Sequence, residues 1–233
     1  KGDGSVEAIR ADLVAILTAV VEDDAMQFDV DGMSVEGIRA GAEYEGVRVA
    51  VPARCGKARL SLQLDIGVGD DAWPPPRVER YPTLLDAAAP AVLAYATETV
   101  VAEKLEAIVV LGDRNSRIKD FFDLHMLATT FAFDRRTLVD AVGRTFERRR
   151  TPIPMETPIG LRAEYWTNPS RPAQTRAFAR RAGVDVPDDG GVGIGALLAE
   201  FLWPVLRDLR EHNTPDSHWV PGGPWESDGQ QSV

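Results

Sequence analysis

Two consecutive predicted helices carry charged side chains on faces that should be apolar. The spacing of apolar residues predicts a helix over about 98–111, and Lys104 falls at the edge of its apolar stripe. A second predicted helix, over about 116–130, places Asp120 on its apolar face and Asp123 at the border. A lysine and a carboxylate in such positions can form a structural ion pair, or they can act on a phosphate ester.

The start of the second predicted helix is unusually basic. Arg117 and Lys119 fall in its first turn, where the positive end of the helix dipole disfavours cations. A bound phosphate would reverse this preference, since the helix N–H groups and both cations would converge on it. We therefore expect a nucleotide or phosphate site formed by Arg117 and Lys119, with Asp123 beside them.

A carboxylate on a strand is a third candidate. Alternation of apolar residues predicts an antiparallel hairpin from strands over 47–51 and 60–66, joined by a loop over 52–57. Asp65 then lies on the polar face, just before two glycines that would let a ligand approach closely. It can be a metal ligand or an ordinary solvent-facing residue. The side chains of this strand expected to face the core are Leu60, Leu62, Leu64 and Ile66.

The elements that must position these residues form an α+β front half and a helical back half. Ser5 is a suitable N-cap for a first helix, and Asp134 is one for a helix that follows the Asp120 helix. Further helices are expected over about 172–182 and 196–211. Pro204 should kink or break the last of them.

Three segments are expected along the chain. Residues 1–95 form an α+β core, and residues 96–212 form a helical domain that carries the lysine and aspartate motifs and the arginine-rich helices. Residues 213–233 are rich in Pro, Gly, Ser and Asp, which predicts a disordered tail. Within the helical domain, Glu103 and Glu106 are expected on the far side of their helix, facing solvent.

The composition excludes several classes of protein. The chain has 233 residues and one cysteine, Cys55, which excludes a disulfide framework and indicates a reducing compartment, taken as the cytoplasm. No apolar run approaches the roughly 18 residues of a membrane span, so no membrane partner is expected. The spacing of Gly191, Gly193 and Gly195 resembles a dinucleotide-binding loop, but no predicted strand precedes it.

The arginines are concentrated in one part of the chain. The formal charge of the whole chain is −10, yet residues 135–181 hold eleven arginines, no lysine and four acidic residues. This asymmetry points to an anionic partner such as RNA, although it also fits a solvated helical surface in a chain that prefers arginine. The arginines expected to contact an RNA backbone are Arg144, Arg148, Arg149, Arg150, Arg176 and Arg180.

Three sequence blocks in this order resemble one family. They are Leu-Asp-Ile-Gly at 64–67, Ala-Glu-Lys-Leu at 102–105 and Arg-x-Lys-Asp-x-x-Asp at 117–123. Together they are similar to the AbiEii/AbiGii-type nucleotidyltransferase toxins, the toxin half of type IV toxin–antitoxin pairs in abortive infection. The likeness extends over roughly residues 5–210.

The resemblance implies a polymerase-β-like nucleotidyltransferase fold that uses an NTP and Mg²⁺, with relatives that modify tRNA. Lys104 matches the active-site lysine of the family, and Asp120 matches its downstream catalytic aspartate. Asp65 matches a strand position where such folds carry a further carboxylate, which makes it an expected catalytic residue and metal ligand. Lys104, Arg117 and Lys119 would neutralise the triphosphate, and a cognate antitoxin is the implied partner.

One family motif does not occur where the resemblance requires it. A Gly-Gly or Gly-Ser turn and a strand with Asp-x-Asp should precede the Ser5 helix, whereas Asp29 and Asp31 follow it. The expected fold is therefore a partial polymerase-β-like domain in a chain that is either truncated or natively degenerate. The leading hypothesis is a toxin that transfers a nucleotide to an RNA, and the expected acceptor is tRNA. The alternatives are a non-catalytic relative that binds an antitoxin or nucleic acid, and a chromosomal nucleotidyltransferase with no toxin role.

Overall fold

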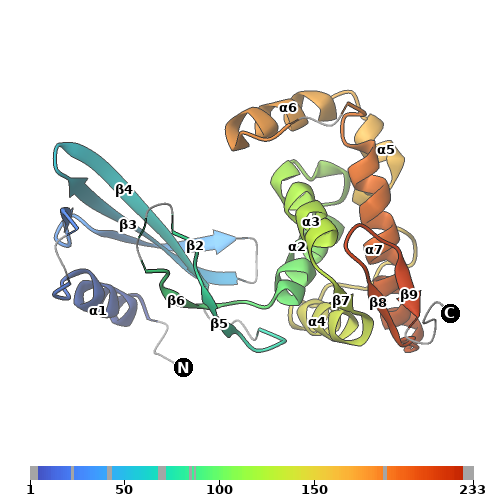
Figure 1. Ribbon diagram of the computed structural model, residues 1–233, viewed down its shortest axis with the longest axis horizontal. Coiled ribbons are helices and arrows are strands. Elements are labelled where there is room, and N and C mark those ends of the chain that lie inside the picture. The colour runs from blue at the N-terminus through green and yellow to red at the C-terminus, as the bar shows by residue number, and fades with distance from the viewer. Residues whose placement is uncertain are drawn as a thin grey trace. The chain divides into compact units, whose positions relative to one another are not determined.

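The chain folds into two compact units, residues 1–71 and 72–233 (Figure 1). The computed structural model describes residues 5–21, 24–40, 44–67, 72–83, 86, 88–185 and 188–227. Helices and antiparallel strands both occur, which confirms the α+β class.

The boundary between the units differs from the predicted one at residue 95. The hairpin of β5 (Arg77–Arg80) and β6 (Ala91–Ala94) belongs to the second unit. The segment before this hairpin is anchored to the helices, since Thr99 Oγ1 donates a hydrogen bond to the carbonyl of Trp73 at 2.8 Å. The Arg144 guanidinium also lies 4.5 Å from the Trp73 ring centre. A change in secondary-structure type therefore does not mark the boundary between the units.

The first unit is one helix packed on an antiparallel sheet. Helix α1 (Val6–Leu17) begins at Ser5, whose hydroxyl accepts a hydrogen bond from the Ala8 N–H at 3.2 Å, as the predicted N-cap requires. The central strand of the sheet pairs with two strands along one edge and with one along the other. The strands are β1 (Met26–Phe28), β2 (Ser34–Ala40), β3 (Tyr44–Cys55), which is central, and β4 (Ala58–Gly67).

The predicted loop over 52–57 is wrong, because β3 continues through Pro52 and the turn contains only Gly56 and Lys57. Gly56 has a φ of +57°, which a tight turn of this kind favours at a glycine. The Pro52 carbonyl accepts from the Asp29 N–H at 2.9 Å. Pro52 therefore faces the gap between β1 and β2, where the ladder has no hydrogen bond to lose.

The leucines of β4 were predicted to face the core, and this prediction is wrong. Leu60, Leu62 and Leu64 are 45%, 40% and 37% exposed. The strand register places them opposite residues of β3 on the face that α1 covers, so the face itself was predicted correctly. Val49 and Val51 of β3 are fully buried in a cluster that includes Ile9 of α1, and Ile66 near the end of β4 packs against this cluster.

The second unit is built around a core of packed helices. Residues of α2, α3, α4 and α7 form this core together with aromatic side chains from the short helix α5 and from the strands of the second unit. Asp134 caps α4, since its carboxylate accepts from the Thr137 N–H at 2.8 Å, as predicted. The helices are α2 (Thr97–Leu111), α3 (Ile118–Thr130), α4 (Arg135–Arg148), α5 (Ala163–Thr167), α6 (Arg171–Ala182) and α7 (Val192–Glu211), with 3-10 turns at Gly112–Arg114 and Ile159–Leu161.

Helix α7 passes through Pro204 without the predicted break. Proline removes one backbone hydrogen bond, but the residues on either side of it are held in the core. Phe201, Leu202, Val205 and Leu206 are all fully buried. Their packing outweighs the local loss and keeps the helix continuous. None of the helices in the described part of the chain is long and apolar enough to cross a membrane.

The segment predicted as a disordered tail is ordered through residue 227. It forms β8 (Ser217–Trp219) and β9 (Trp225–Ser227), which continue a sheet that starts with β7 (Phe133–Asp134). Trp219 is fully buried and donates its indole N–H to the Ala128 carbonyl at 2.7 Å. The burial of Trp219, with Trp225 packed partly buried against the same core, outweighs the polar and turn-forming composition around them. Residues 228–233 lie outside the described residues.

The glycines that resemble a dinucleotide loop have a packing role instead. All three lie at the start of α7, and Gly191 and Gly195 lie beside the buried Trp166. A Cβ on Gly195 would collide with the indole nitrogen of Trp166, and one on Gly191 would lie 2.5 Å from the same ring. Gly191 also has a φ of +106°, which disfavours any other residue.

Candidate functional site

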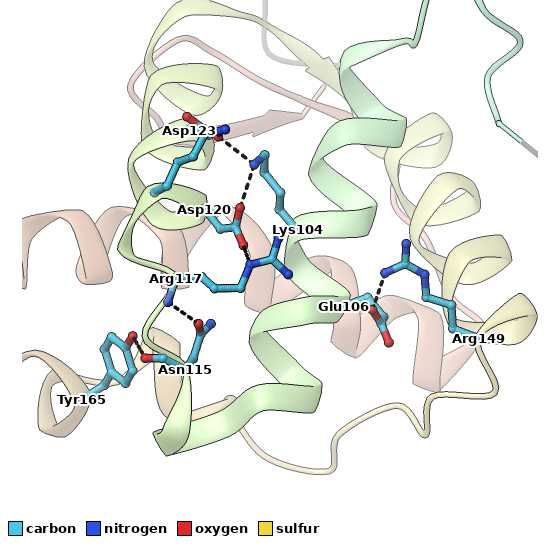
Figure 2. A network of polar contacts seen from close by, with 9 residues as sticks. Lys104, Glu106, Asn115, Arg117, Asp120, Asp123, Arg149 and Tyr165 are labelled. Carbon is cyan, nitrogen blue, oxygen red and sulfur yellow. Dashed lines mark hydrogen bonds and ion pairs between the residues drawn. The ribbon is translucent and has the colours of Figure 1, made fainter. Parts of the chain in front are cut away.

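The site begins with a buried asparagine that fixes the start of α3. Asn115 is fully buried, and its side-chain oxygen accepts from the Arg117 N–H at 2.8 Å, which orders the first turn of the helix (Figure 2). Its carbonyl accepts from the Tyr165 hydroxyl at 2.7 Å and from the Arg171 guanidinium. Three separate segments therefore meet at one residue, and the basic start of α3 is held rigidly.

Lys104 of α2 lies between two carboxylates of α3 (Figure 2). Its Nζ is 2.8 Å from Asp120 Oδ1 and 2.7 Å from Asp123 Oδ2. The Asp120 side chain is only 5% exposed, so it requires a cationic partner. Burial alone would lower the pKa of Lys104, but the hydrogen bonds and charges of Asp120 and Asp123 outweigh it and raise that pKa. Lys104 is therefore a permanent cation at neutral pH.

Arg117 and Lys119 lie on the solvent side of this ion pair. Arg117 Nε is 3.0 Å from Asp120 Oδ2, and Lys119 Nζ is 4.0 Å from Asp123 Oδ2. Asp120 Oδ2 is buried and accepts no hydrogen bond from the described residues, so the Arg117 contact is close but poorly aligned. Both cationic side chains are mostly exposed. They are free to turn toward a ligand without breaking a strong bond.

A pocket of about 460 Å³ opens beside these residues. Lys104, Arg117, Lys119 and Asp120 line one side of it. Side chains of α6 line the other side, and they include Gln174, Phe178 and Arg181. A pocket of this volume can hold a ligand the size of a nucleotide. Its cations and the positive end of the α3 dipole suit an anionic group.

The structure thus brings together five of the predicted site residues, in one unit of the chain. They are Lys104, Arg117, Lys119, Asp120 and Asp123.

Asp65 lies in the first unit and has a different set of partners. It forms two hydrogen bonds with Arg48, its cross-strand neighbour on β3, at 2.7 and 2.8 Å. The hydrogen bond to Arg48 lowers the pKa of Asp65, and both side chains are about half exposed. In this arrangement Asp65 is a solvent-facing carboxylate with its charge already paired.

The arginines at the end of α4 pack against α2. Arg149 Nη1 is 2.6 Å from Glu106 Oε2 (Figure 2). Arg148 Nη2 is 3.5 Å from Glu103 Oε1. Glu106 is buried, so the prediction that it faces solvent is wrong. Helix α4 covers the side of α2 that was assigned to water, and Thr151 Oγ1 adds a hydrogen bond to Glu106 at 2.6 Å.

The other predicted RNA-binding arginines have different surroundings. Arg144 lies over the Trp73 ring, and Arg150 is exposed just after the end of α4. Arg176 and Arg180 are exposed on α6, and neither forms an ion pair with a carboxylate in the described ranges. The most accessible positive charge of the arginine-rich region is therefore on α6.

The predicted metal ligand and its neighbouring candidate carboxylates are paired with cations of the chain in this structure. Within the described ranges, no group of three or more His, Cys, Asp or Glu side chains is placed to hold a metal ion. The candidate carboxylates are also occupied by cations of the chain, since Asp65 binds Arg48 and Asp120 and Asp123 share Lys104. Mg²⁺ needs carboxylate oxygens that are free to coordinate it. The arrangement fits an anion better than a metal.

Sequence reasoning missed the part of the site that α6 supplies. Nothing in the sequence distinguished Arg181 from the other arginines, and no motif indicated a role for Gln174. The apolar stripe of a helix predicts which side is buried, but it does not identify the neighbouring helix. Asn115 also had a readable signal, because an asparagine side chain commonly accepts a hydrogen bond from the backbone N–H two residues on and so forms a turn.

The comparisons with known proteins identify the family of the chain. Residues 1–204 match the family model described as "Nucleotidyl transferase AbiEii toxin, Type IV TA system". The match covers most of the chain, so the chain belongs to this family, as the three sequence blocks predicted. No significantly similar curated protein and no significantly similar solved structure was found.

Proposed function

We propose that this chain, as a member of the AbiEii nucleotidyl transferase toxin family, transfers a nucleotide from an NTP to an RNA. The proposed acceptor is tRNA, and the proposed protein partner is a cognate antitoxin. In this reaction a hydroxyl oxygen of the RNA attacks the α-phosphorus of the NTP, and the bond to pyrophosphate breaks. Negative charge grows on the leaving pyrophosphate, so cations fixed around it accelerate the transfer.

The observation that carries the proposal is the position of Lys104 beside the α3 pocket. Its ammonium is held by Asp120 and Asp123. Arg117 and Lys119 line the same pocket. In the proposed reaction Lys104, Arg117 and Lys119 bind the triphosphate. Asp120 is the proposed catalytic carboxylate, and it also holds Lys104 in place.

Magnesium enters the proposal as the ion that accompanies the NTP phosphates. Asp65 keeps its proposed role as a further catalytic carboxylate and metal ligand, which requires its pair with Arg48 to open. The proposed RNA contacts are led by Arg176 and Arg180, which are exposed on α6. Arg144, Arg148, Arg149 and Arg150 would add contacts from around the end of α4.

The direct test supplies tRNA and Mg²⁺ with NTPs that carry the label on either the α- or the γ-phosphate. Nucleotidyl transfer moves the α-label to the RNA and leaves the γ-label in pyrophosphate. Lys104→Ala and Asp120→Ala should abolish the transfer. Lys57→Ala, in the β3–β4 turn, and Asp140→Ala, on the exposed face of α4, are matched controls that should retain it.

Two results would contradict the proposal in different ways. Transfer of the γ-label would mean that the chain is a kinase rather than a nucleotidyltransferase. Undiminished transfer of the α-label in both variants would remove the assigned roles of Lys104 and Asp120.

A second candidate function is favoured by the ion pairs of the carboxylates. Asp65, Asp120 and Asp123 are each bound by a cation of the chain, which is what a protein that binds without catalysing would retain. Such a chain would bind an antitoxin or nucleic acid only. It would bind tRNA in the same assay and transfer neither label.

A further inference from the structure

We propose that Arg181 of α6 binds a phosphate group in the pocket at the start of α3. The ligand site is then formed by two helices, and α6 supplies a wall that none of the three family-like sequence blocks contains. The identity of the ligand rests on the proposed function, whereas the site itself rests on the geometry of α6.

The residues of α6 that line the pocket share one face of the helix. They are Gln174, Ala177, Phe178 and Arg181, which are spaced at i, i+3, i+4 and i+7. By the same spacing, Arg176 lies on the opposite side of the helix and Arg180 lies on its flank. The arginines of α6 therefore divide into one that faces the pocket and others that face away from it.

The position of α6 is fixed by the same asparagine that fixes α3. Arg171, in the first turn of α6, is buried and donates to the carbonyls of Asn115 and Asp113. Its guanidinium lies 3.8 Å from the Tyr165 ring centre, and it donates to Gln174 Oε1 at 2.9 Å. Asn115 in turn orders the first turn of α3. Both walls of the pocket are thus held by one network before any ligand binds.

A second contact holds the far end of the wall. The rings of Phe122 on α3 and Phe178 on α6 are 4.9 Å apart. This apolar contact sets the spacing of the two helices near Arg181. A pocket with both walls fixed loses little entropy when it binds a ligand.

The charge of the pocket requires an anion. Lys104, Arg117, Lys119 and Arg181 contribute four positive charges, and Asp120 and Asp123 offset two of them. Arg181 is exposed and forms no ion pair with a carboxylate in the described part of the chain. Most arginines of its region do have a carboxylate or an aromatic partner, although the chain as a whole is strongly acidic.

A phosphate is the anion that suits this pocket. Arginine binds phosphate oxygens through two parallel N–H groups, and a helix start supplies further positive potential. The phosphate could belong to the triphosphate of an NTP or to the backbone of an RNA. Both sources offer the same chemistry to Arg181, and binding measurements separate them.

The test measures binding by the full chain to two probes, inorganic tripolyphosphate and a short single-stranded RNA with a 5′-hydroxyl. Titration calorimetry compares Arg181→Gln with Arg207→Gln, which removes an exposed arginine of α7 that lies outside the pocket. Arg181→Gln should weaken tripolyphosphate binding about tenfold, as the loss of one charge-assisted contact does. Arg207→Gln should change it by less than about twofold. Arg181→Lys should restore part of the affinity.

The outcomes separate the two phosphate sources. Weaker binding of tripolyphosphate in Arg181→Gln supports a triphosphate ligand, and weaker binding of the RNA probe alone supports a backbone phosphate. Equal affinities of Arg181→Gln and Arg207→Gln for both probes would overturn the proposal. A wild-type chain that binds neither probe would overturn it as well.

This test is independent of nucleotide transfer. If the wild-type chain binds tripolyphosphate through Arg181 but transfers no label, the proposed function fails and the phosphate site stands. If the wild-type chain transfers the α-label and Arg181→Gln binds normally, the phosphate site fails and the proposed function stands.

Discussion

Lys104 and Asp120 form an ion pair of 2.8 Å that joins helices α2 and α3 across a nearly buried carboxylate. Such a pair can hold two helices together, act on a substrate, or do both. Stability depends on whether the charges are balanced, whereas catalysis depends on whether they are present. The two roles can therefore be separated by comparing variants that lack one charge of the pair with a variant that lacks both.

Lys104→Met should destabilise the chain more than Asp120→Asn does. The first change leaves Asp120 and Asp123 without their shared cation, at a cost of about 3 kcal/mol in the free energy of unfolding. After the second change, Lys104 keeps its bond of 2.7 Å to Asp123. The double variant should recover part of the stability, measured by urea unfolding. Transfer of the α-label to tRNA should be lost in all three variants. Recovered transfer in the double variant would assign the pair a purely structural role.

Arg149 should act mainly on stability, although its position in the sequence predicts RNA binding. Arg149→Gln would leave the buried Glu106 with a hydrogen bond from Thr151 and no paired cation. The expected loss is about 2 kcal/mol in the free energy of unfolding. Arg180→Gln, an exposed change on α6, should alter unfolding by less than about 0.5 kcal/mol. Equal stability of the two variants in thermal unfolding would contradict this assignment.

The convergence of Lys104, Asp120 and Asp123 could be predicted from the sequence because angular positions on a helix follow from its period alone. The burial of Glu106 could not. The prediction assumed one buried face on α2, whereas α4 covers a second face. Periodicity also placed Leu62 on the correct face of β4 without indicating that α1 leaves this part of the strand uncovered.

Composition was a poor guide to the C-terminal segment. Its prolines and glycines predicted disorder, but Trp219 and Trp225 hold it against the helical core. A few large apolar side chains can bury enough surface to order a short segment whose average composition is polar. The pocket wall on α6 was equally hidden, since it depends on hydrogen bonds between Arg171 and a loop more than fifty residues away.

The exposed arginines of α6 should carry the salt dependence of RNA binding. Each cation that contacts a phosphate of single-stranded RNA adds about 0.7 to the slope of log affinity against log salt concentration. The double change Arg176→Gln with Arg180→Gln should therefore lower the slope by about 1.4. Fluorescence anisotropy of a labelled single-stranded RNA over a salt series measures it. An unchanged slope would mean that RNA is bound elsewhere on the chain.

Gly195→Ala should destabilise the second unit although alanine favours helices. Alanine gains about 1 kcal/mol over glycine in a helix interior. At this position, however, the new methyl group collides with the buried indole of Trp166, which cannot move without disturbing the core. We expect a net loss of about 2 kcal/mol, measured by thermal unfolding. Gly37→Ala on β2 is the control, since no atom lies within 4 Å of the added carbon. A Gly195→Ala chain as stable as wild type would contradict the tight packing at Trp166.

Tyr165 should ionise at a higher pH than an ordinary tyrosine. Burial raises the pKa of its hydroxyl to about 12, although the nearby charge of Arg171 opposes the shift. Because this folded-state pKa lies above the ordinary value of 10.0, stability from Tyr165 is complete below pH 10 and is lost as the pH rises toward 12. An absorbance titration of the four tyrosines should show a late component that Tyr165→Phe removes. The same change should lower stability at neutral pH by about 1 kcal/mol, because the Asn115 carbonyl loses one of its hydrogen bonds. A titration in which the wild-type and Tyr165→Phe chains ionise over the same range would contradict the burial of this hydroxyl at the centre of the site.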